Sequence, residues 1–480
     1  MAQKSLKKNA FINVIKTFMS LVFPLITFPY ASRILLPTGL GKVNFALSVI
    51  SYFTLISSLG IENYGIREAA KLRDDKQKLS QFSKEIFLIN IISTIIAYIL
   101  LIIAILFVSK LFEYRKLLFV TSATILFTTL GINWLYIALE DYFYITIRTI
   151  AFQCLSIILL FIFVKNEEDY VVYAAISVVS SVGSNLLNFV HSKKYISIKL
   201  TNKCNFHKHI KPIFVLFSMA IAVKIYTVLD TTMLGFIKGD WDVGIYTAAT
   251  KINKIVLTLV LAITSVFIPR LSYYANQKDK LEFNRLAYKG FDILLLIAIP
   301  CTIGLSVLSK PIVHVFCGEE YFQAVLPMII MNPIVLIIGI SSYIGINIFL
   351  SVGKEIYKLY SSVAGAIINL LLNLILIPKL GCVGAAISTL IAELGVTIVQ
   401  LLLVKNILTL GPVLKSFIVY LLNSLIMIIP VYICCILIND YVIQLFVGIL
   451  LGVTVYFVLL LFQKNTLLYE IISRRVKDEK

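Results

Sequence analysis

A small set of charged side chains interrupts stretches of this chain that are otherwise apolar. A charge in the middle of a membrane costs about 2.5–3.5 kcal/mol on insertion scales, so such residues normally face a partner or a water-filled cavity. They are the side chains with which this protein could bind a charged ligand. The set is Lys16, Arg33, Lys224, Asp230, Lys251, Lys254 and Glu393, with Arg33 at the outer end of its stretch.

Lysine outnumbers acid within these stretches. Four lysines accompany only Asp230 and Glu393, so the set is net positive. A drug or metal-ion exporter needs acidic groups to bind cations, whereas a cationic cavity suits an anion such as phosphate or pyrophosphate. Lys251 and Lys254 are three residues apart and share one helix face. We therefore predict that the lysines, with Arg33, line an anion-binding cavity.

Simpler interpretations of the same charges stay open. Lys16 could extend to the cytoplasmic interface, since long basic side chains reach toward water. Lys224 could pair with Asp230, although a separation of six residues is poor helical geometry for a pair. Asp230 and Glu393 are candidates either for carrying a coupling proton or for a structural role.

Catalytic residues, metal ligands and cofactors are not expected, and we predict that the protein is not an enzyme. The seven cysteines include no Cys-x-x-Cys pair and mostly fall in apolar stretches, where they are typical small buried residues. His207 and His209 lie in a Lys-rich segment, for which we expect a solvated surface.

The composition excludes a water-soluble fold. Hydrophobic residues make up 59% of the chain, charged residues 14%, and the mean hydropathy is +0.94. A soluble globular protein is about half apolar and a quarter charged. The length accommodates about fourteen spans of roughly 20 residues. We therefore predict an all-α integral membrane protein with about 14 transmembrane helices.

The net charge of +18 follows from the expected topology and requires no nucleic acid partner. Lys and Arg concentrate in loops that alternate along the chain, and cytoplasmic loops of membrane proteins carry such an excess. The prediction is a multi-pass protein of a prokaryotic cytoplasmic membrane with both termini in the cytoplasm. The basic segments are the N-terminus, 67–84, 193–211, 270–289 and the tail 464–480.

Sequence patterns recur about 203 residues apart. Gly41 opens GKVNFALSVI after the first apolar span, and Gly244 opens GIYTAATKIN after the seventh. The same offset relates Arg67 to Arg270, and each arginine leads into a basic loop. Duplicated membrane bundles are the usual construction of a transporter that rocks one half against the other around a central site.

The repeat predicts the domain organisation. Residues 1–200 would form an N-lobe of six spans, 201–410 a C-lobe of six, and 411–480 an additional helix pair with a basic cytoplasmic tail. Segment 193–211 would be the linker between the lobes. Prolines in the first span predict a bend there, and the amphipathic segments 62–84 and 270–289 predict short interfacial helices.

The chain resembles the Wzx-type polysaccharide repeat-unit flippases of the exporter superfamily that also contains the multidrug and toxic-compound exporters. The resemblance extends to about residue 410 and consists of loose patterns of Gly, Pro, Asn and aromatic residues. Its main segments are NVIKTFMSLVFPLITFPYASRILLPTGLGKVNFALSVISYFTLISSLGIENYGIREAA, VGIYTAATKINKIVLTLVLAITSVFIPRLS, GEEYFQAVLPM and INLLLNLILIPKLGCVGAAISTLIAE.

This resemblance implies two pseudo-symmetric six-helix lobes around a V-shaped central cavity, with two further C-terminal helices. It implies transport of undecaprenyl-pyrophosphate-linked oligosaccharide from the inner to the outer leaflet for cell-surface polysaccharide synthesis. Membrane lipid, a glycan polymerase and other polysaccharide-assembly proteins are the expected partners.

Other functions remain as alternatives. A drug or cation antiporter of the same fold is disfavoured by the lysine excess, whereas a lipid II-type precursor flippase shares the pyrophosphate substrate. A membrane glycosyltransferase or glycan polymerase would need acid/base residues in a large outer loop. The longest outer segment, 309–323, offers only His314, Glu319 and Glu320. A channel or scramblase would not require duplicated halves.

Overall fold

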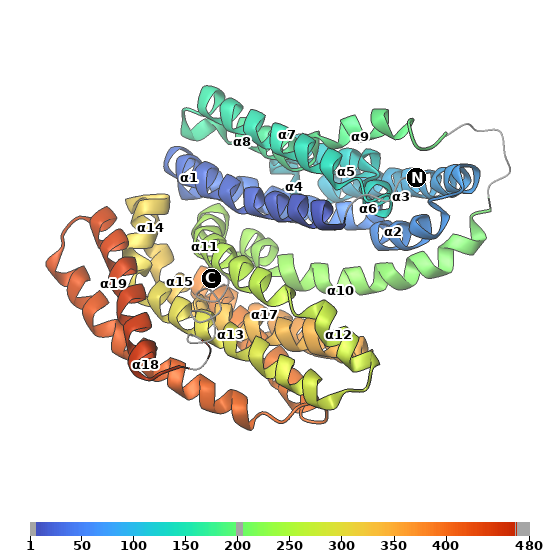
Figure 1. The fold of residues 1–480 in the computed structure, drawn as a ribbon. Coiled ribbons are helices and arrows are strands. Elements are labelled where there is room, and N and C mark those ends of the chain that lie inside the picture. The colour runs from blue at the N-terminus through green and yellow to red at the C-terminus, as the bar shows by residue number, and fades with distance from the viewer. Residues whose placement is uncertain (1–5, 198–204, 466, 468–480) are drawn as a thin grey trace. The chain divides into compact units, whose positions relative to one another are not determined.

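The computed structural model describes residues 6–197, 205–465 and 467, and every regular element within these ranges is a helix. The predicted all-α fold is therefore confirmed for the described residues. Contacts divide the chain into two compact units, 1–244 and 245–480. Figure 1 follows the chain from blue through green to red and labels the helices.

The first unit contains the elements that precede residue 245. They are α1 (Leu6–Ser58), α2 (Ile61–Leu72), α3 (Lys76–Phe107), α4 (Ser109–Glu113), α5 (Arg115–Gly131), α6 (Asn133–Ala138), α7 (Tyr142–Phe163), the 3-10 turn η1 (Glu167–Asp169), α8 (Tyr170–Val178), the π-helix η2 (Val179–Gly183), α9 (Asn185–Ser192), α10 (His207–Ile237) and the first turn of α11 (Asp240–Ser265).

The second unit contains the rest of α11 and the elements after it. They are α12 (Ile268–Asn276), α13 (Lys280–Val307), α14 (Ser309–Cys317), the 3-10 helix η3 (Glu319–Ala324), α15 (Val325–Met331), α16 (Ile334–Ser342), the π-helix η4 (Tyr343–Phe349), α17 (Glu355–Val404), α18 (Gly411–Leu437) and α19 (Tyr441–Phe462).

The long helices turn apolar side chains outward and small polar ones inward. On α3, Ile95 and Ile99 are exposed, whereas Asn90 and Ser93 are buried and hydrogen-bond the Ser57 carbonyl of α1. In water this arrangement would be unfavourable, but lipid is as apolar as the exposed side chains, and interhelical hydrogen bonds suit polar groups there. The protein is a multi-pass membrane protein.

Two helices are too long for one crossing of a membrane. A helix of the length of α1 extends about 80 Å, whereas the hydrocarbon core is about 30 Å thick. Non-helical backbone at Leu36 breaks α1 immediately before Pro37, and Gly381 breaks α17. The break thus lies at the exit of the predicted first span, beside Pro37, whereas Pro24 and Pro29 stay within regular helix.

The number of spans differs from the expected number. Among the described residues, 10 helices are long and apolar enough to cross a membrane, or 11 if the bent pair 319–349 is one span. That total counts α1 and α2 together as one span, and it counts the long helix α17 as one further span. The expected number of 14 is not confirmed and stays a prediction.

The repeat-related glycines meet where α1 passes the first turn of α11, inside the first unit. A Cβ atom on Gly41 would collide with the Asp240 carbonyl, and one on Gly244 would collide with the Pro37 carbonyl. Asp240 follows Pro37 by the same 203 residues that separate the two glycines. The contact is therefore reciprocal, as expected for two equivalent segments related by a two-fold axis.

Helix α10 is attached to the first unit along its length. At its C-terminal end, Phe236 packs edge-on against Phe45 of α1, and Lys110 of α4 donates to the Gly235 carbonyl. About one turn earlier, the Thr232 hydroxyl donates to Ser48 Oγ at 3.0 Å. These contacts explain why the compact unit extends to residue 244. The predicted lobes 1–200, 201–410 and 411–480 describe the sequence repeat and stay a prediction.

The two amphipathic segments, predicted to form short interfacial helices, are each divided between a short helix and the start of a long one, since residues 76–84 belong to α3 and residues 280–289 to α13. Helix α2 buries Ile61, Tyr64 and Ala69 on one face, and α12 covers residues 268–276 of the equivalent segment. Of the predicted linker, residues 198–204 lie outside the described residues, and α10 already begins at His207.

We predict that Gly41→Ala lowers the melting temperature of the purified protein in detergent. The added methyl group must push the α1 and α11 backbones apart, and such overpacking costs about 1–3 kcal/mol. Gly304→Ala is the matched control because its Cβ would meet nothing closer than the Met427 methyl at 4.0 Å. Equal melting temperatures for the two variants would contradict the close crossing.

Candidate functional site

Two of the predicted site residues, Lys224 and Asp230, lie on α10 in the first unit. Lys224 is half-buried and Asp230 is 8% exposed, close to Tyr52 of α1. The Thr232 hydroxyl, which contacts Ser48, also lies 3.4 Å from the Tyr52 hydroxyl oxygen. The α1–α10 interface is therefore polar near the C-terminal ends of these two apolar helices.

The other candidates of the first unit lie on α1. Arg33 is exposed, three residues before the break at Leu36. The Lys16 side chain lies outside the described residues. Its role, like that of Arg33, stays a prediction.

The second unit carries the remaining candidates. Lys251 is half-buried and Lys254 exposed, one turn apart on α11. Glu393 of α17 is buried, with 7% of its surface exposed. The Tyr246 and Thr389 hydroxyl oxygens, 3.2 Å apart, join α11 to the half of α17 that contains Glu393. Among the predicted candidates, each unit thus combines lysine with a buried acid, and the shared cavity between them stays a prediction.

A buried arginine escaped the sequence analysis. Arg148 of α7 is 7% exposed, and its guanidinium donates to Ser184 Oγ at 2.7 Å, Asn185 Oδ1 at 3.1 Å and Asn133 Oδ1 at 2.7 Å. Among the described residues it has no carboxylate partner, and its Nε has no hydrogen-bond partner. Its position inside the apolar segment 142–163 was the signal that could have found it.

Irregular backbone surrounds Arg148. Ile132 adopts a left-handed conformation with φ 41° and separates α5 from α6, which begins with Asn133. The π-helix η2 ends one residue before Ser184. Broken helices and π-bulges inside a membrane are tolerated where other groups satisfy the backbone, and they often mark functional positions.

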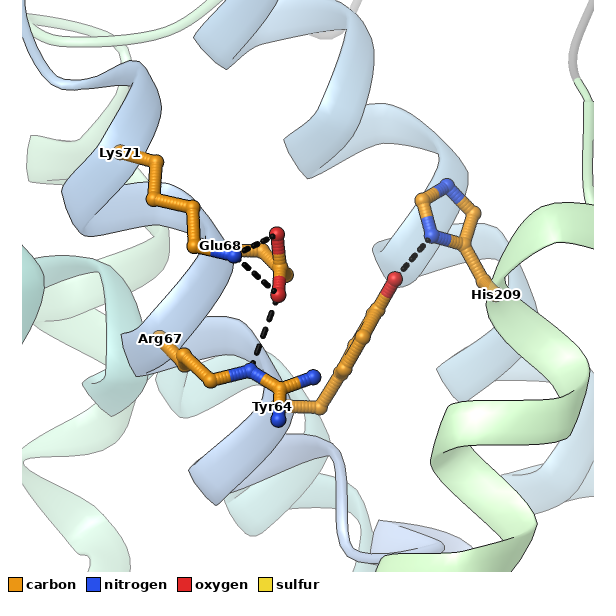
Figure 2. Close-up of polar contacts among 5 residues, drawn as sticks. All are labelled: Tyr64, Arg67, Glu68, Lys71 and His209. Carbon is orange, nitrogen blue, oxygen red and sulfur yellow. Dashed lines mark hydrogen bonds and ion pairs between the residues drawn. The ribbon is translucent and has the colours of Figure 1, made fainter.

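A second buried polar cluster holds the start of α10 against α2 and α3. His209 is 2% exposed; its Nδ1 lies 2.8 Å from the Tyr64 hydroxyl oxygen, and its Nε2 lies 2.8 Å from Glu85 Oε2. Figure 2 shows Tyr64 pointing at the imidazole. The expectation of a solvated His209 was wrong, because apolar residues of α2, α3 and α6 enclose this segment.

Glu85 is the centre of that cluster. Its carboxylate, 2% exposed, also accepts from the Lys208 ammonium at 2.9 Å, the Asn205 backbone N–H at 2.9 Å and Gln81 at 2.8 Å. One carboxylate on α3 therefore fixes the residues on both sides of the point where α10 begins. The helix that carries it is capped by Asp75, whose pKa is lowered by the Lys78 backbone N–H and the Lys78 ammonium.

Helix α2 also carries an exposed group of charges, which contrasts with the buried cluster around Glu85. Arg67 and Lys71 both donate to Glu68, at 2.9 and 3.0 Å (Figure 2). Both basic side chains are more than half exposed. Exposed pairs of this kind contribute about 0–1 kcal/mol to the free energy of unfolding. They therefore orient the charged side chains and add little to stability.

The residues the structure describes hold no group of three or more His, Cys, Asp or Glu side chains arranged to bind a metal.

The sequence matches the models of two known protein families. The model of a family described as polysaccharide biosynthesis protein matches residues 6–275, more than half of the chain. The chain belongs to this family. A second model, MatE, matches residues 215–375, about a third of the chain.

Relatives occur in different bacteria. A putative O-antigen transporter of Escherichia coli (strain K12) is 25% identical over 84% of this chain and 97% of its own length. The capsular polysaccharide biosynthesis protein CapF of Staphylococcus aureus is 26% identical over 74% of this chain and 88% of its own.

Solved structures share the fold. The lipid II flippase MurJ in its inward closed conformation superposes with a TM-score of 0.76 at 19% identity, covering 96% of this chain and 99% of MurJ. An inward-facing multidrug resistance MATE transporter gives a TM-score of 0.66 at 15% identity, covering 83% and 97%. At these identities the likeness establishes the fold alone.

We predict that Glu85→Ala destabilises the protein far more than Glu68→Ala. Removing the buried carboxylate leaves Lys208, His209 and the Asn205 N–H without their acceptor, and breaking a buried pair costs about 3–5 kcal/mol. The exposed Glu68 contributes at most about 1 kcal/mol. Melting temperatures in detergent compare the two, and similar losses would contradict the assignment of Glu85 as the anchor of α10.

Proposed function

We propose that this protein is a flippase for undecaprenyl-pyrophosphate-linked oligosaccharides. It would carry the repeat units of a surface polysaccharide from the inner to the outer leaflet of the cytoplasmic membrane of a prokaryote. The observation that carries the proposal is membership of the polysaccharide biosynthesis protein family, together with the E. coli relative described as a putative O-antigen transporter.

The charges inside the apolar helices support an anionic substrate. The described lysines Lys224, Lys251 and Lys254 accompany the acids Asp230 and Glu393. Arg148 adds a buried cation with no carboxylate partner among the described residues. A pyrophosphate would be a charge partner for such a set.

The mechanism follows from the repeat. The halves rock and expose a central cavity first to the cytoplasm and then to the outside. Lys16, Lys224, Lys251 and Lys254, with Arg33 at the outer end, bind the pyrophosphate during this movement. The polyprenyl tail stays in lipid, and the sugars occupy the polar interior. Asp230 or Glu393 carries the coupling proton.

Two alternatives share the fold. A MATE-like drug or cation antiporter would use Asp230 and Glu393 to bind its cation, and the lysine excess opposes it. A lipid II-type precursor flippase would use the same lysines, because its substrate is also a pyrophosphate. The pool of lipid-linked oligosaccharides in a deletion strain separates them. Accumulation of a surface-glycan unit on the inner leaflet supports the proposal, and an unchanged pool refutes it.

We predict that both termini and the loops around residues 76 and 278 face the cytoplasm. The excess of Lys and Arg in these segments sets the orientation. In a variant without native cysteines, Lys76→Cys and Lys278→Cys should resist an impermeant thiol reagent added to intact cells, whereas Asn166→Cys should react. Labelling of position 76 or 278 from outside would overturn the topology.

We predict that Lys224→Gln and Lys251→Gln each reduce glycan export at least tenfold, because each removes a charge that binds the pyrophosphate. Lys→Arg at either position should be milder. Lys278→Gln, which makes the same charge change in a loop, serves as the control. Export at the wild-type level in both Lys224→Gln and Lys251→Gln, at equal protein abundance, would contradict the anion-binding mechanism and favour the antiporter.

A further inference from the structure

A cavity of about 710 Å³ lies where three connections of the second unit meet. They are the α12–α13 connection, the η4–α17 connection and the segment that follows α17. The Ser272 and Ser351 hydroxyl oxygens, 3.1 Å apart, join the first two, and η4 packs against both α12 and α17. The cavity is therefore part of the packed structure of this unit.

The charged side chains that line this cavity are net positive. The basic ones are Lys278, Lys280 and Lys354. Among the described lining residues the one carboxylate is that of Asp279, which caps the start of α13. None of the three lysines forms an ion pair with another described residue. The Lys354 ammonium lies 5.5 Å from the centre of the Tyr357 ring, a contact that leaves its charge uncompensated.

Neighbouring charges outside the lining leave this balance in place. Glu282 pairs with Arg285, with Nη1 and Oε1 3.1 Å apart. Glu355 and Lys405, each adjacent in sequence to a lining residue, carry opposite charges. A hollow whose walls have one sign of charge raises the local concentration of ligands of the opposite sign. The cavity therefore favours an anion.

The cavity also offers hydrogen-bonding groups and an apolar surface. The side-chain amides of Asn276, Asn284 and Asn406 form no hydrogen bond with other described residues. Leu350, which is 45% exposed, and the buried Phe283 contribute apolar surface to the same lining. A ligand that matches all three features carries negative charge, several hydrogen-bonding groups and an apolar face.

We propose that this cavity binds a soluble nucleoside diphosphate. Lys280 begins α13 and Lys354 precedes α17, and these two lysines bind the phosphates as point charges. The amides bind the sugar and the base, and the base lies against Leu350. Small-molecule sites typically have volumes of about 300–1,000 Å³. Inorganic phosphate alone would leave the amides and the apolar surface without a role.

The position of the cavity suits a soluble ligand. Lys280, Gly353 and Asn406 are exposed, so the cavity opens to solvent. The basic segment 270–289, which supplies most of the polar lining, is expected to face the cytoplasm, where nucleotides are abundant. This ligand is distinct from the lipid-linked pyrophosphate of the proposed transport, so the inference goes beyond the proposed function.

Isothermal titration calorimetry of the full-length protein in detergent tests the proposal, with uridine, adenosine and guanosine diphosphates as probes. Wild type should bind at least one of the three. Lys280→Gln combined with Lys354→Gln should weaken that binding at least about tenfold, because hydrogen bonds to charged groups are the strong ones. The control is Lys379→Gln with Lys415→Gln, which makes the same charge change on α17 and α18 outside the lining and should bind like wild type.

Asn406→Trp provides a second route, because it reduces the volume of the cavity without changing its charge and should also weaken binding. Equal weakening in the two double variants would show a diffuse charge effect and overturn the site. Inorganic pyrophosphate that binds as tightly as the nucleoside diphosphate would show a simple anion site and also overturn the proposal, as would the absence of binding by all three probes at about 1 mM. These measurements do not involve glycan export, so they succeed or fail independently of the flippase function.

Discussion

The close crossing of Gly41 and Gly244 is the constraint on which the arrangement around it depends. Only residues without a Cβ let the α1 backbone touch the first turn of α11 through the Pro37 and Asp240 carbonyls. Membrane helices gain no hydrophobic energy by associating in lipid, so close backbone packing supplies much of their attraction. The contacts of Phe45 with Phe236 and Tyr114 gather around this crossing.

Hydrocarbon imposes the second constraint, because a backbone group exposed by a helix break has no water to bond. The breaks therefore coincide with polar side chains. Asn188 donates to the Gly131 carbonyl beside the break at Ile132. In the second unit, Asn347 of the π-helix η4 donates to the Thr264 carbonyl of α11. Asn188 and Asn347 thus serve as partners for interrupted helices.

Periodicity and repetition made the helices, the amphipathic α2 and the equivalence of Gly41 and Gly244 predictable, since these are properties of local sequence. The burial of His209 was not, because a histidine in a basic segment looks solvated until Glu85, 124 residues away, is placed beside it. The association of α10 with the first unit was equally hidden. It depends on contacts with α1, α2 and α3 that no local pattern encodes.

The distribution of charge limits how a ligand could drive movement between two states. A ligand shifts a conformational equilibrium only by its difference in affinity for the two conformations. Arg148 is bonded to Asn133 of α6 and to Ser184 and Asn185 at the start of α9, all within one unit, so a ligand there would gain little from a change between units. Lys224 belongs to one unit, and Lys251 and Lys254 belong to the other. A substrate that drives such a change must contact groups whose surroundings differ between the protein's two conformations.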